Sequence, residues 1–254
     1  MPCGERWSGF GPTDMPNLAI VAALEREVRP LIKSWHLSEK QYSGRNFRFF
    51  EHDRAVLVCG GIGAEAARRA AEAVIVLYHP AIVYSVGYAG SLDPTIGIGQ
   101  VIHPARVIDT RDGSSVSIAG GNGVLATSGS VAHPTHKRTL RESFRAQAVD
   151  MEASAVARAA QARGIDFSAV KTISDEFEFE LPDTERFVDP EGRFREAQFA
   201  FYVAIRPWLW QRVVRLARNS RTASRALCGE LQKLIANPIS APVAPAQPSN
   251  PEVR

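Results

Sequence analysis

The chain has 254 residues, of which 45% are hydrophobic, and its formal net charge is +3. This length and composition suffice for a full hydrophobic core, in one large α/β domain or two small ones. The mild charge, without a basic patch interleaved with aromatic residues, argues against nucleic-acid binding. Three widely spaced cysteines, Cys3, Cys59 and Cys228, argue against a disulfide framework or a zinc cluster.

Neither a membrane span nor a secretion signal is indicated. No apolar run reaches the roughly 18 residues that a membrane-spanning helix needs. The N-terminus lacks a basic segment followed by an apolar one. We therefore expect a cytoplasmic protein in a reducing compartment.

The predicted elements alternate between strands and helices along the chain. Residues 1–16 are rich in Gly and Pro and are expected to form a flexible leader. Strands are predicted at 17–24, 81–92, 98–110, 123–130, 147–150 and 167–175, with a further strand pair that turns at His52–Asp53. Helices are predicted from residue 25, with Pro30 in the first turn, and at 64–78, 152–163 and within 193–235. The Pro-rich segment 236–254 is expected to be a disordered tail.

The strands are apolar throughout rather than alternating with polar residues. This pattern is typical of a central sheet that helices cover on both faces. In such sheets, ligands bind beyond the carboxyl ends of the strands. Three acids follow predicted strands at such ends, namely Glu27, Glu152 and Asp175.

One acid after a strand is usually a helix cap or a solvated turn, but three at one edge suggest a site. No His or Cys lies close to them in the sequence, so a metal site is not indicated. Carboxylates without a metal suit acid–base chemistry and the binding of sugar hydroxyls. We expect the helix dipole to keep Glu152 ionised and Met151 to offer an apolar surface to a sugar.

Five segments in order resemble the nucleoside phosphorylase superfamily, in the branch of methylthioadenosine/adenosylhomocysteine nucleosidases. They are VAALEREV (21–28), CGGIGAEAA (59–67), SVGYAGSLDPTIGIGQVI (85–102), AVDMEASAVA (148–157) and VKTISD (170–175). The resemblance implies a single three-layer α/β domain over 17–235, with a mixed, partly barrel-like sheet. It also implies cleavage of the bond between a purine and its ribose, without a cofactor and with inorganic phosphate as an alternative nucleophile to water.

The resemblance also implies the roles of individual residues. Glu27 matches the residue that activates the attacking water, and Asp175 matches the acid that protonates the purine at N7. Glu152 matches the residue that holds the ribose hydroxyls, and Met151 the one that packs on the sugar. The remaining residues expected around the substrate are Gly63, Tyr88, Ala89, Gly90, Val131 and Ser174, with Ala132 loosely mapped to the base pocket.

Two residues depart from the pattern of the family. Tyr88 stands where these nucleosidases have a small residue near the nucleophile, which leaves the choice between water and phosphate open. Lys171 stands where an arginine is common near the water-activating acid.

The segment 187–227 resembles the C-terminal part of hopanoid-associated phosphorylases, which remove adenine from adenosylhopane. Within it, residues 209–218 predict a basic amphipathic helix with Trp210 and Val214 on the apolar face. The ordinary explanation is that this face packs on the sheet. Contact with a membrane through 199–218 is the alternative.

Two further patterns are set aside. GIGAEA (61–66) fits a dinucleotide fingerprint, but the next predicted strand does not end in the acid that such a site needs. His133 and His136 form H-x-x-H, but Pro134 favours a loop, and no third ligand is evident.

The sequence therefore predicts an enzyme that releases adenine from adenosylhopane, with methylthioadenosine or adenosylhomocysteine hydrolysis, or purine nucleoside phosphorolysis, as the alternatives. A non-catalytic lipid-binding protein on the same fold is the alternative from another class. Because related enzymes are often homodimers or larger, a homo-oligomer is also expected.

Overall fold

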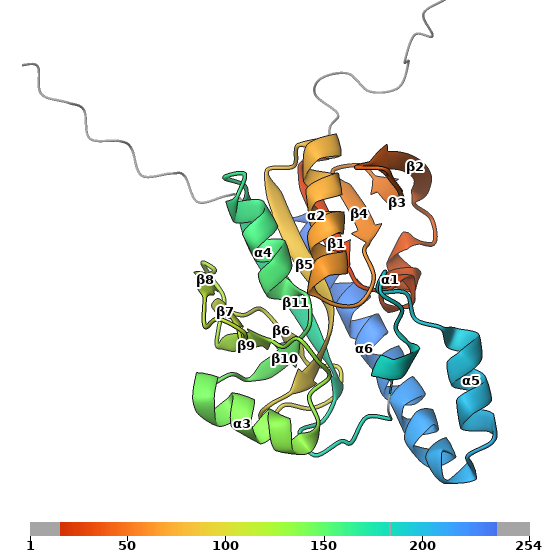
Figure 1. The fold of residues 1–254 in the computed structure, drawn as a ribbon. Coiled ribbons are helices and arrows are strands. Elements are labelled where there is room, and N and C mark those ends of the chain that lie inside the picture. The colour runs from red at the N-terminus through yellow and green to blue at the C-terminus, as the bar shows by residue number, and fades with distance from the viewer. Residues whose placement is uncertain (1–15, 183, 238–254) are drawn as a thin grey trace, which may run out of the picture.

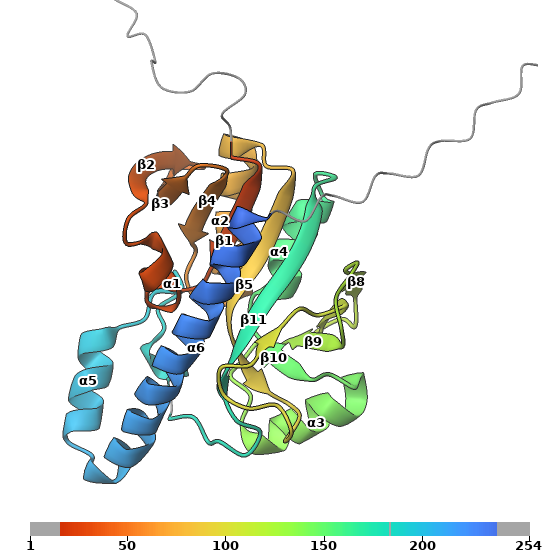
Figure 2. The same ribbon diagram turned by 180° about the vertical axis from the view of Figure 1, so that it is seen from behind.

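The computed structural model describes residues 16–182 and 184–237, and almost all of the expected leader and tail lie outside these residues. The described chain forms one mixed sheet between two layers of helices (Figures 1 and 2). The three-layer α/β architecture predicted from the sequence is therefore confirmed.

The sheet is built around the long strand β5. Its strands are β1 (Leu18–Ala22), β2 (His36–Tyr42), β3 (Arg45–His52), β4 (Ala55–Cys59), β5 (Ile82–Ser91), β6 (Val101–Ile102), β7 (Arg106–Asp109), β8 (Ser115–Ser117), β9 (Val124–Thr127), β10 (Ala148–Asp150) and β11 (Asp166–Asp175). The main path runs β2-β3-β4-β1-β5-β10-β9-β7-β8, while β11 also pairs with β5. Because β11 runs along most of β5 and β10 bonds only at its end, the sheet branches there.

The helices are α1 (Glu25–Ile32), α2 (Ala64–Tyr78), α3 (Pro134–Phe144), α4 (Ala153–Gln161), α5 (Glu196–Ala204) and α6 (Trp210–Ala236), with short 3₁₀ turns η1 (Glu185–Phe187) and η2 (Pro207–Leu209). Strand β1 shows why its sequence is apolar throughout. Leu18 and Ile20 pack towards α1 and α6, whereas Ala19 and Val21 pack towards α2 and α4. Both faces of the strand are thus covered.

Several elements differ from the prediction. The polar strand β2 and the short strand β8 were not predicted, and the predicted strand 98–110 is split into β6 and β7. Pro30 lies inside α1 and not in its first turn. The helix tolerates the missing N–H because Val28, Leu31 and Ile32 are buried in the core under α6.

The segment around His133 is a helix and not the expected loop. Pro134 is the first residue of α3, where its absent N–H would have no helical partner in any case. His133 precedes the helix as its N-cap residue.

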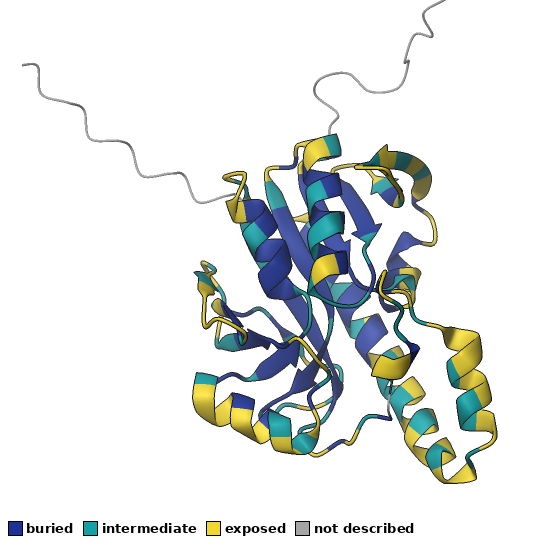
Figure 3. Ribbon diagram, in the orientation of Figure 1, coloured by how far each residue is buried: buried dark blue, intermediate teal, exposed yellow. Residues whose placement is uncertain are grey.

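Helix α5 and the first part of α6 form a hairpin that projects from the body of the molecule (Figure 1). The buried part of α6 begins at Ala223, and α5 has no buried residue (Figure 3). The expectation that the apolar face of 209–218 packs on the sheet is therefore wrong. Five large apolar side chains, which we call the hairpin patch, are exposed there: Phe201, Ile205, Trp208, Trp210 and Val214.

Candidate active site

The three predicted acids line one cavity of about 180 Å³, which we call the acid cavity. Glu27 lies in the first turn of α1, Glu152 is the N-cap residue of α4, and Asp175 ends β11. Each helix or strand end faces the branch of the sheet, so residues up to 148 positions apart in the chain meet there. Glu27 and Asp175 are buried, and Glu152 is half-buried.

The surroundings of Glu27 make a negative charge on its carboxyl group energetically unfavourable. Its Oε2 atom is buried without a hydrogen-bond partner among the described residues. Burial, followed by the charge of Glu152, raises its pKa from 4.5 to about 8, although Lys171 opposes the shift. A side chain at Gly87 would not fit beside this carboxylate, since a Cβ there would lie 2.7 Å from Oε2. The glycine thus makes room for Glu27.

Glu152 is held by backbone N–H groups. Gly63 donates to its Oε1 atom at 2.9 Å, and Met151 donates to its Oε2 atom at 3.3 Å. Burial and then the charge of Asp150 nevertheless raise the pKa of Glu152. The pKa of Glu152 thus shifts opposite to the direction that the helix dipole alone would give, because these two effects outweigh the favourable N–H groups.

Lys171 is the cation that balances these acids. It is fully buried, and its Nζ atom lies 2.9 Å from Oδ2 of Asp150. Burial opposes its charge, but Asp150, Glu152 and Glu27 together raise its pKa. Lys171 therefore carries a positive charge beneath the acid cavity, paired with Asp150 more directly than with Glu27.

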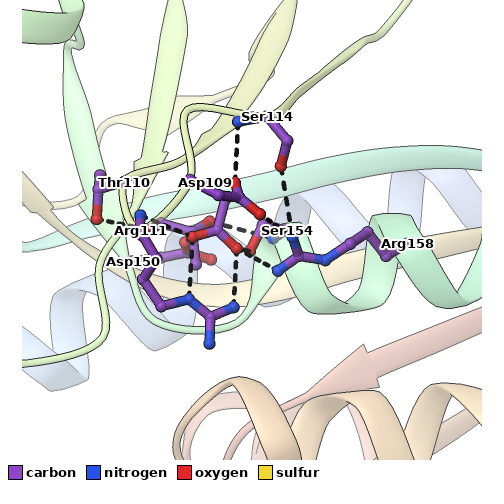
Figure 4. A network of polar contacts seen from close by, with 9 residues as sticks. Asp109, Thr110, Arg111, Ser114, Asp150, Ser154 and Arg158 are labelled. Atoms are coloured by element: carbon purple, nitrogen blue, oxygen red, sulfur yellow. Dashed lines mark hydrogen bonds and ion pairs between the residues drawn. The ribbon is translucent and has the colours of Figure 1, made fainter.

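A polar network fixes Asp150 and the start of α4 (Figure 4). Asp150 accepts hydrogen bonds from the Thr127 hydroxyl at 2.8 Å and from the N–H of Ala153 at 2.9 Å. Nearby, the Ser154 hydroxyl donates to the buried Asp109 at 3.0 Å. Asp109 also pairs with the guanidinium groups of Arg111 and Arg158. The network ties α4, and with it Glu152, to strands β7, β9 and β10.

Asp175 accepts hydrogen bonds on both carboxylate oxygens. The Ser174 hydroxyl donates to Oδ1 at 2.9 Å, and Lys137 donates to Oδ2 at 2.5 Å. Ser174, expected to bind substrate, thus contacts Asp175. A Cβ at Gly90 would lie 2.8 Å from Oδ2, so this glycine makes room for Asp175 as Gly87 does for Glu27.

The other predicted residues lie around the acid cavity or beside it. Ala89, Gly90, Val131, Ala132, Met151 and Tyr88 line it. Gly63 lines an adjoining cavity of about 430 Å³, the middle cavity, to which Tyr88, Val131 and Met151 also contribute. The Tyr88 hydroxyl donates to the carbonyl of Ser220 in α6 at 2.8 Å, and burial raises the pKa of Tyr88. This tyrosine therefore joins β5 to α6 at the border of both cavities.

A third cavity of about 780 Å³, which we call the outer cavity, adjoins the middle cavity along α1 and α6. Tyr88, Phe194, Leu216 and Ser220 are among the residues that line both. The acid, middle and outer cavities therefore lie next to one another between the three acids and the base of the projecting hairpin. Within 16–182 and 184–237, no group of three or more His, Cys, Asp or Glu residues could hold a metal ion.

Comparison with known proteins identifies the family. The model of the Phosphorylase superfamily matches residues 17–123 and 116–204. The chain belongs to the Phosphorylase superfamily. No curated protein sequence matches this chain significantly.

Solved structures share the fold of this superfamily member at low sequence identity. The 5'-methylthioadenosine/S-adenosylhomocysteine nucleosidase from Neisseria meningitidis is 15% identical with a TM-score of 0.66, covering 87% of this chain and 99% of that one. The futalosine hydrolase of Helicobacter pylori is 16% identical with a TM-score of 0.61, covering 85% and 97%. The nucleosidase structure contains methylthio-immucillin-A.

Two residues of the site were not found from the sequence. Asp150 belongs to the segment AVDMEASAVA, but its pairing with Lys171 depends on β10 and β11 lying close in space. Lys137 was missed because its segment was interpreted as a loop. The signal available in the sequence was Pro134, because proline is common at the first position of a helix and would have predicted a helix that includes Lys137.

Proposed function

We propose that the protein cleaves the N-glycosidic bond of an adenine nucleoside. The observation that carries the proposal is the meeting of Glu27, Glu152 and Asp175 in one cavity of a phosphorylase-superfamily fold. Cleavage leaves positive charge on the ribosyl group and negative charge on the purine. Carboxylates beside the sugar stabilise the first, and a proton donor beside the base neutralises the second.

The environments of the acids suit different roles in this reaction. A pKa near 8 lets Glu27 accept a proton from the attacking water at working pH. Glu152 is fixed by two N–H groups beside Met151, where it can accept hydrogen bonds from two ribose hydroxyls. Asp175 then faces the purine, where protonation at N7 assists departure of the base.

A lipid-linked nucleoside is the substrate class that we favour, with adenosylhopane as the specific proposal. The middle cavity is lined partly by apolar side chains, including Leu181, Val188, Phe194 and Leu216. It offers a long apolar 5′ substituent a path from the ribose site towards α6. Methylthioadenosine or adenosylhomocysteine is the alternative, since the Neisseria protein with this fold is named for them.

The hairpin patch supports contact with a bilayer. Trp208 is 71% exposed and Phe201 is 69% exposed, at the end of the hairpin where α5 turns into α6. Exposed arginines on α6, namely Arg218, Arg221 and Arg225, complement anionic headgroups, whereas Arg212 and Arg215 pair with Glu180 and Glu176. No helix among the described residues is long and apolar enough to cross a membrane, so we propose an interfacial contact.

Vesicle binding tests this part of the proposal. We expect the full chain to sediment with vesicles containing anionic lipid, and Trp208→Ser with Phe201→Ser to weaken binding about tenfold or more through lost apolar burial. Val76→Ser, an exposed apolar residue on α2, is the matched control and should bind as the wild type does. If the wild-type protein dimerises through the hairpin patch and does not bind vesicles, the patch is an interface between two copies of this chain and not a membrane contact.

Glu152→Ala separates an enzyme from a lipid-binding protein on this fold. Adenine release, measured by chromatography, should fall in this variant while vesicle binding persists. Lipid affinity without adenine release from any nucleoside by the wild-type protein would favour the binding protein.

A further inference from the structure

Lys137 is a buried cation that the proposed mechanism has not used. It belongs to α3, is completely inaccessible to solvent and lines the acid cavity. Its Nζ atom donates to Oδ2 of Asp175 at 2.5 Å and to the carbonyl oxygen of Glu176 at 2.7 Å. Nothing in the family resemblance assigned a role to this lysine.

Asp175 lies among hydrogen-bond donors, one of which is the ammonium of Lys137. Asp175 accepts from the Ser174 hydroxyl on one oxygen and from the Lys137 ammonium on the other. Each oxygen of the Asp175 carboxylate thus accepts a hydrogen bond, and the ammonium of Lys137 is the charged donor that contacts Oδ2 directly. Burial of either charge alone would be unfavourable, so the two groups stabilise each other as an ion pair.

We propose that Lys137 supplies the proton that Asp175 passes to the leaving base, an inference that rests on the proposed function. As the C1′–N9 bond breaks, its electron pair moves to the purine. Oδ2 of Asp175 takes a proton from the ammonium of Lys137, and N7 takes a proton from Oδ2. Lys137 is left as a neutral amine and Asp175 returns to a carboxylate. The water that attacks C1′ gives its proton to Glu27, and exchange with solvent restores both groups.

Lys137 is accordingly a positioning residue that acts through Asp175. Its loss should matter only where the leaving group needs a proton. Adenine is such a group, whereas 4-nitrophenolate leaves readily without protonation. The leaving group therefore distinguishes a role in proton supply from a role in folding.

The test compares two substrates that carry the same 5′ substituent, an adenine nucleoside and the matching 4-nitrophenyl riboside. For Lys137→Met, we expect kcat on the adenine nucleoside to fall by about 10²–10⁴-fold, the usual size of general acid catalysis, and kcat on the nitrophenyl riboside to change less than about threefold. Arg138→Met removes an exposed cation of the same helix, paired with Glu178, and should leave both rates unchanged.

A double variant adds an independent readout on the adenine nucleoside alone. If Lys137 acts through Asp175, Lys137→Met combined with Asp175→Asn should be no slower than Asp175→Asn. Equal losses on both substrates, losses that multiply in the double variant, or an unimpaired Lys137→Met would overturn the inference while the proposed function stands. Wild-type protein that cleaves neither substrate would overturn the proposed function, and the inference with it.

Discussion

Glu27 combines burial with a role that needs its charged form. Its pKa near 8 means that much of the protein holds this carboxyl protonated at neutral pH. If the ionised form accepts the proton of the attacking water, kcat/KM should rise about tenfold per pH unit below 8 and level off above it. Initial rates of adenine release between pH 6 and 9 test this. A profile that is flat across this range would remove Glu27 from the role of base.

The same residue should make the folded protein less stable as the pH rises. Between about pH 4.5 and 8, folded Glu27 retains a proton that the unfolded chain has lost. The free energy of unfolding therefore falls with rising pH across this window, by an amount on the order of a few kcal/mol.

The variant Glu27→Gln should remove this slope and raise stability at pH 8 while abolishing activity. Chemical denaturation at pH 5 and pH 8 measures both effects, and Glu25→Gln, a half-exposed acid of the same helix, is the control. A variant with the pH slope of the wild type would show that Glu27 is not the group responsible.

Strand β5 illustrates how one element serves two acids. Gly87 has a φ of +142° and lies against Glu27, and Gly90 lies against Asp175. Gly87→Ala should displace the Glu27 carboxylate, and a displacement of this kind can cost about 10²-fold in kcat. Gly97→Ala is the control, because a Cβ there meets nothing within 4 Å. Wild-type turnover in Gly87→Ala would mean that the carboxylate does not need its present position.

Most of the strands and helices around the three acids were predictable because they are strongly apolar or rich in alanine. Helix α2 was predicted with the bounds that the structure has, and β1, β5, β10 and β11 within two residues. Strand β2 was not predictable in the same way, since HLSEKQY is mostly polar and its pairing with β3 gives it its structure. Helix α3 was missed because Pro134 was treated as a helix breaker, although it occupies the first helical position.

Interactions across the sheet set the limit of prediction at the site. The sequence pointed to Glu27, Glu152 and Asp175 through their places after strands. The pairs Lys171–Asp150 and Lys137–Asp175 join residues more than 20 positions apart, and no local sequence pattern predicts such pairs. The direction of the pKa shift of Glu152 was likewise missed, because burial depends on the whole fold.

At the scale of the molecule, three adjoining cavities lie between the three acids and the projecting hairpin. The acid cavity lies at the branch of the sheet, and the outer cavity runs along α1 and α6 to the base of the hairpin. The amphipathic sequence of 209–218 could not show whether its apolar face packs on the sheet or is exposed. The exposure of Trp210 and Val214 follows from the tertiary arrangement, in which the buried residues of α6 begin at Ala223.

The most direct test of this account is adenine release from adenosylhopane and from methylthioadenosine, each with and without inorganic phosphate. We predict faster release from adenosylhopane, and the dependence on phosphate identifies the nucleophile. Faster release from methylthioadenosine would contradict the lipid-linked substrate. Absence of adenine release from both, under all conditions, would contradict the central claim that the three acids cleave an N-glycosidic bond.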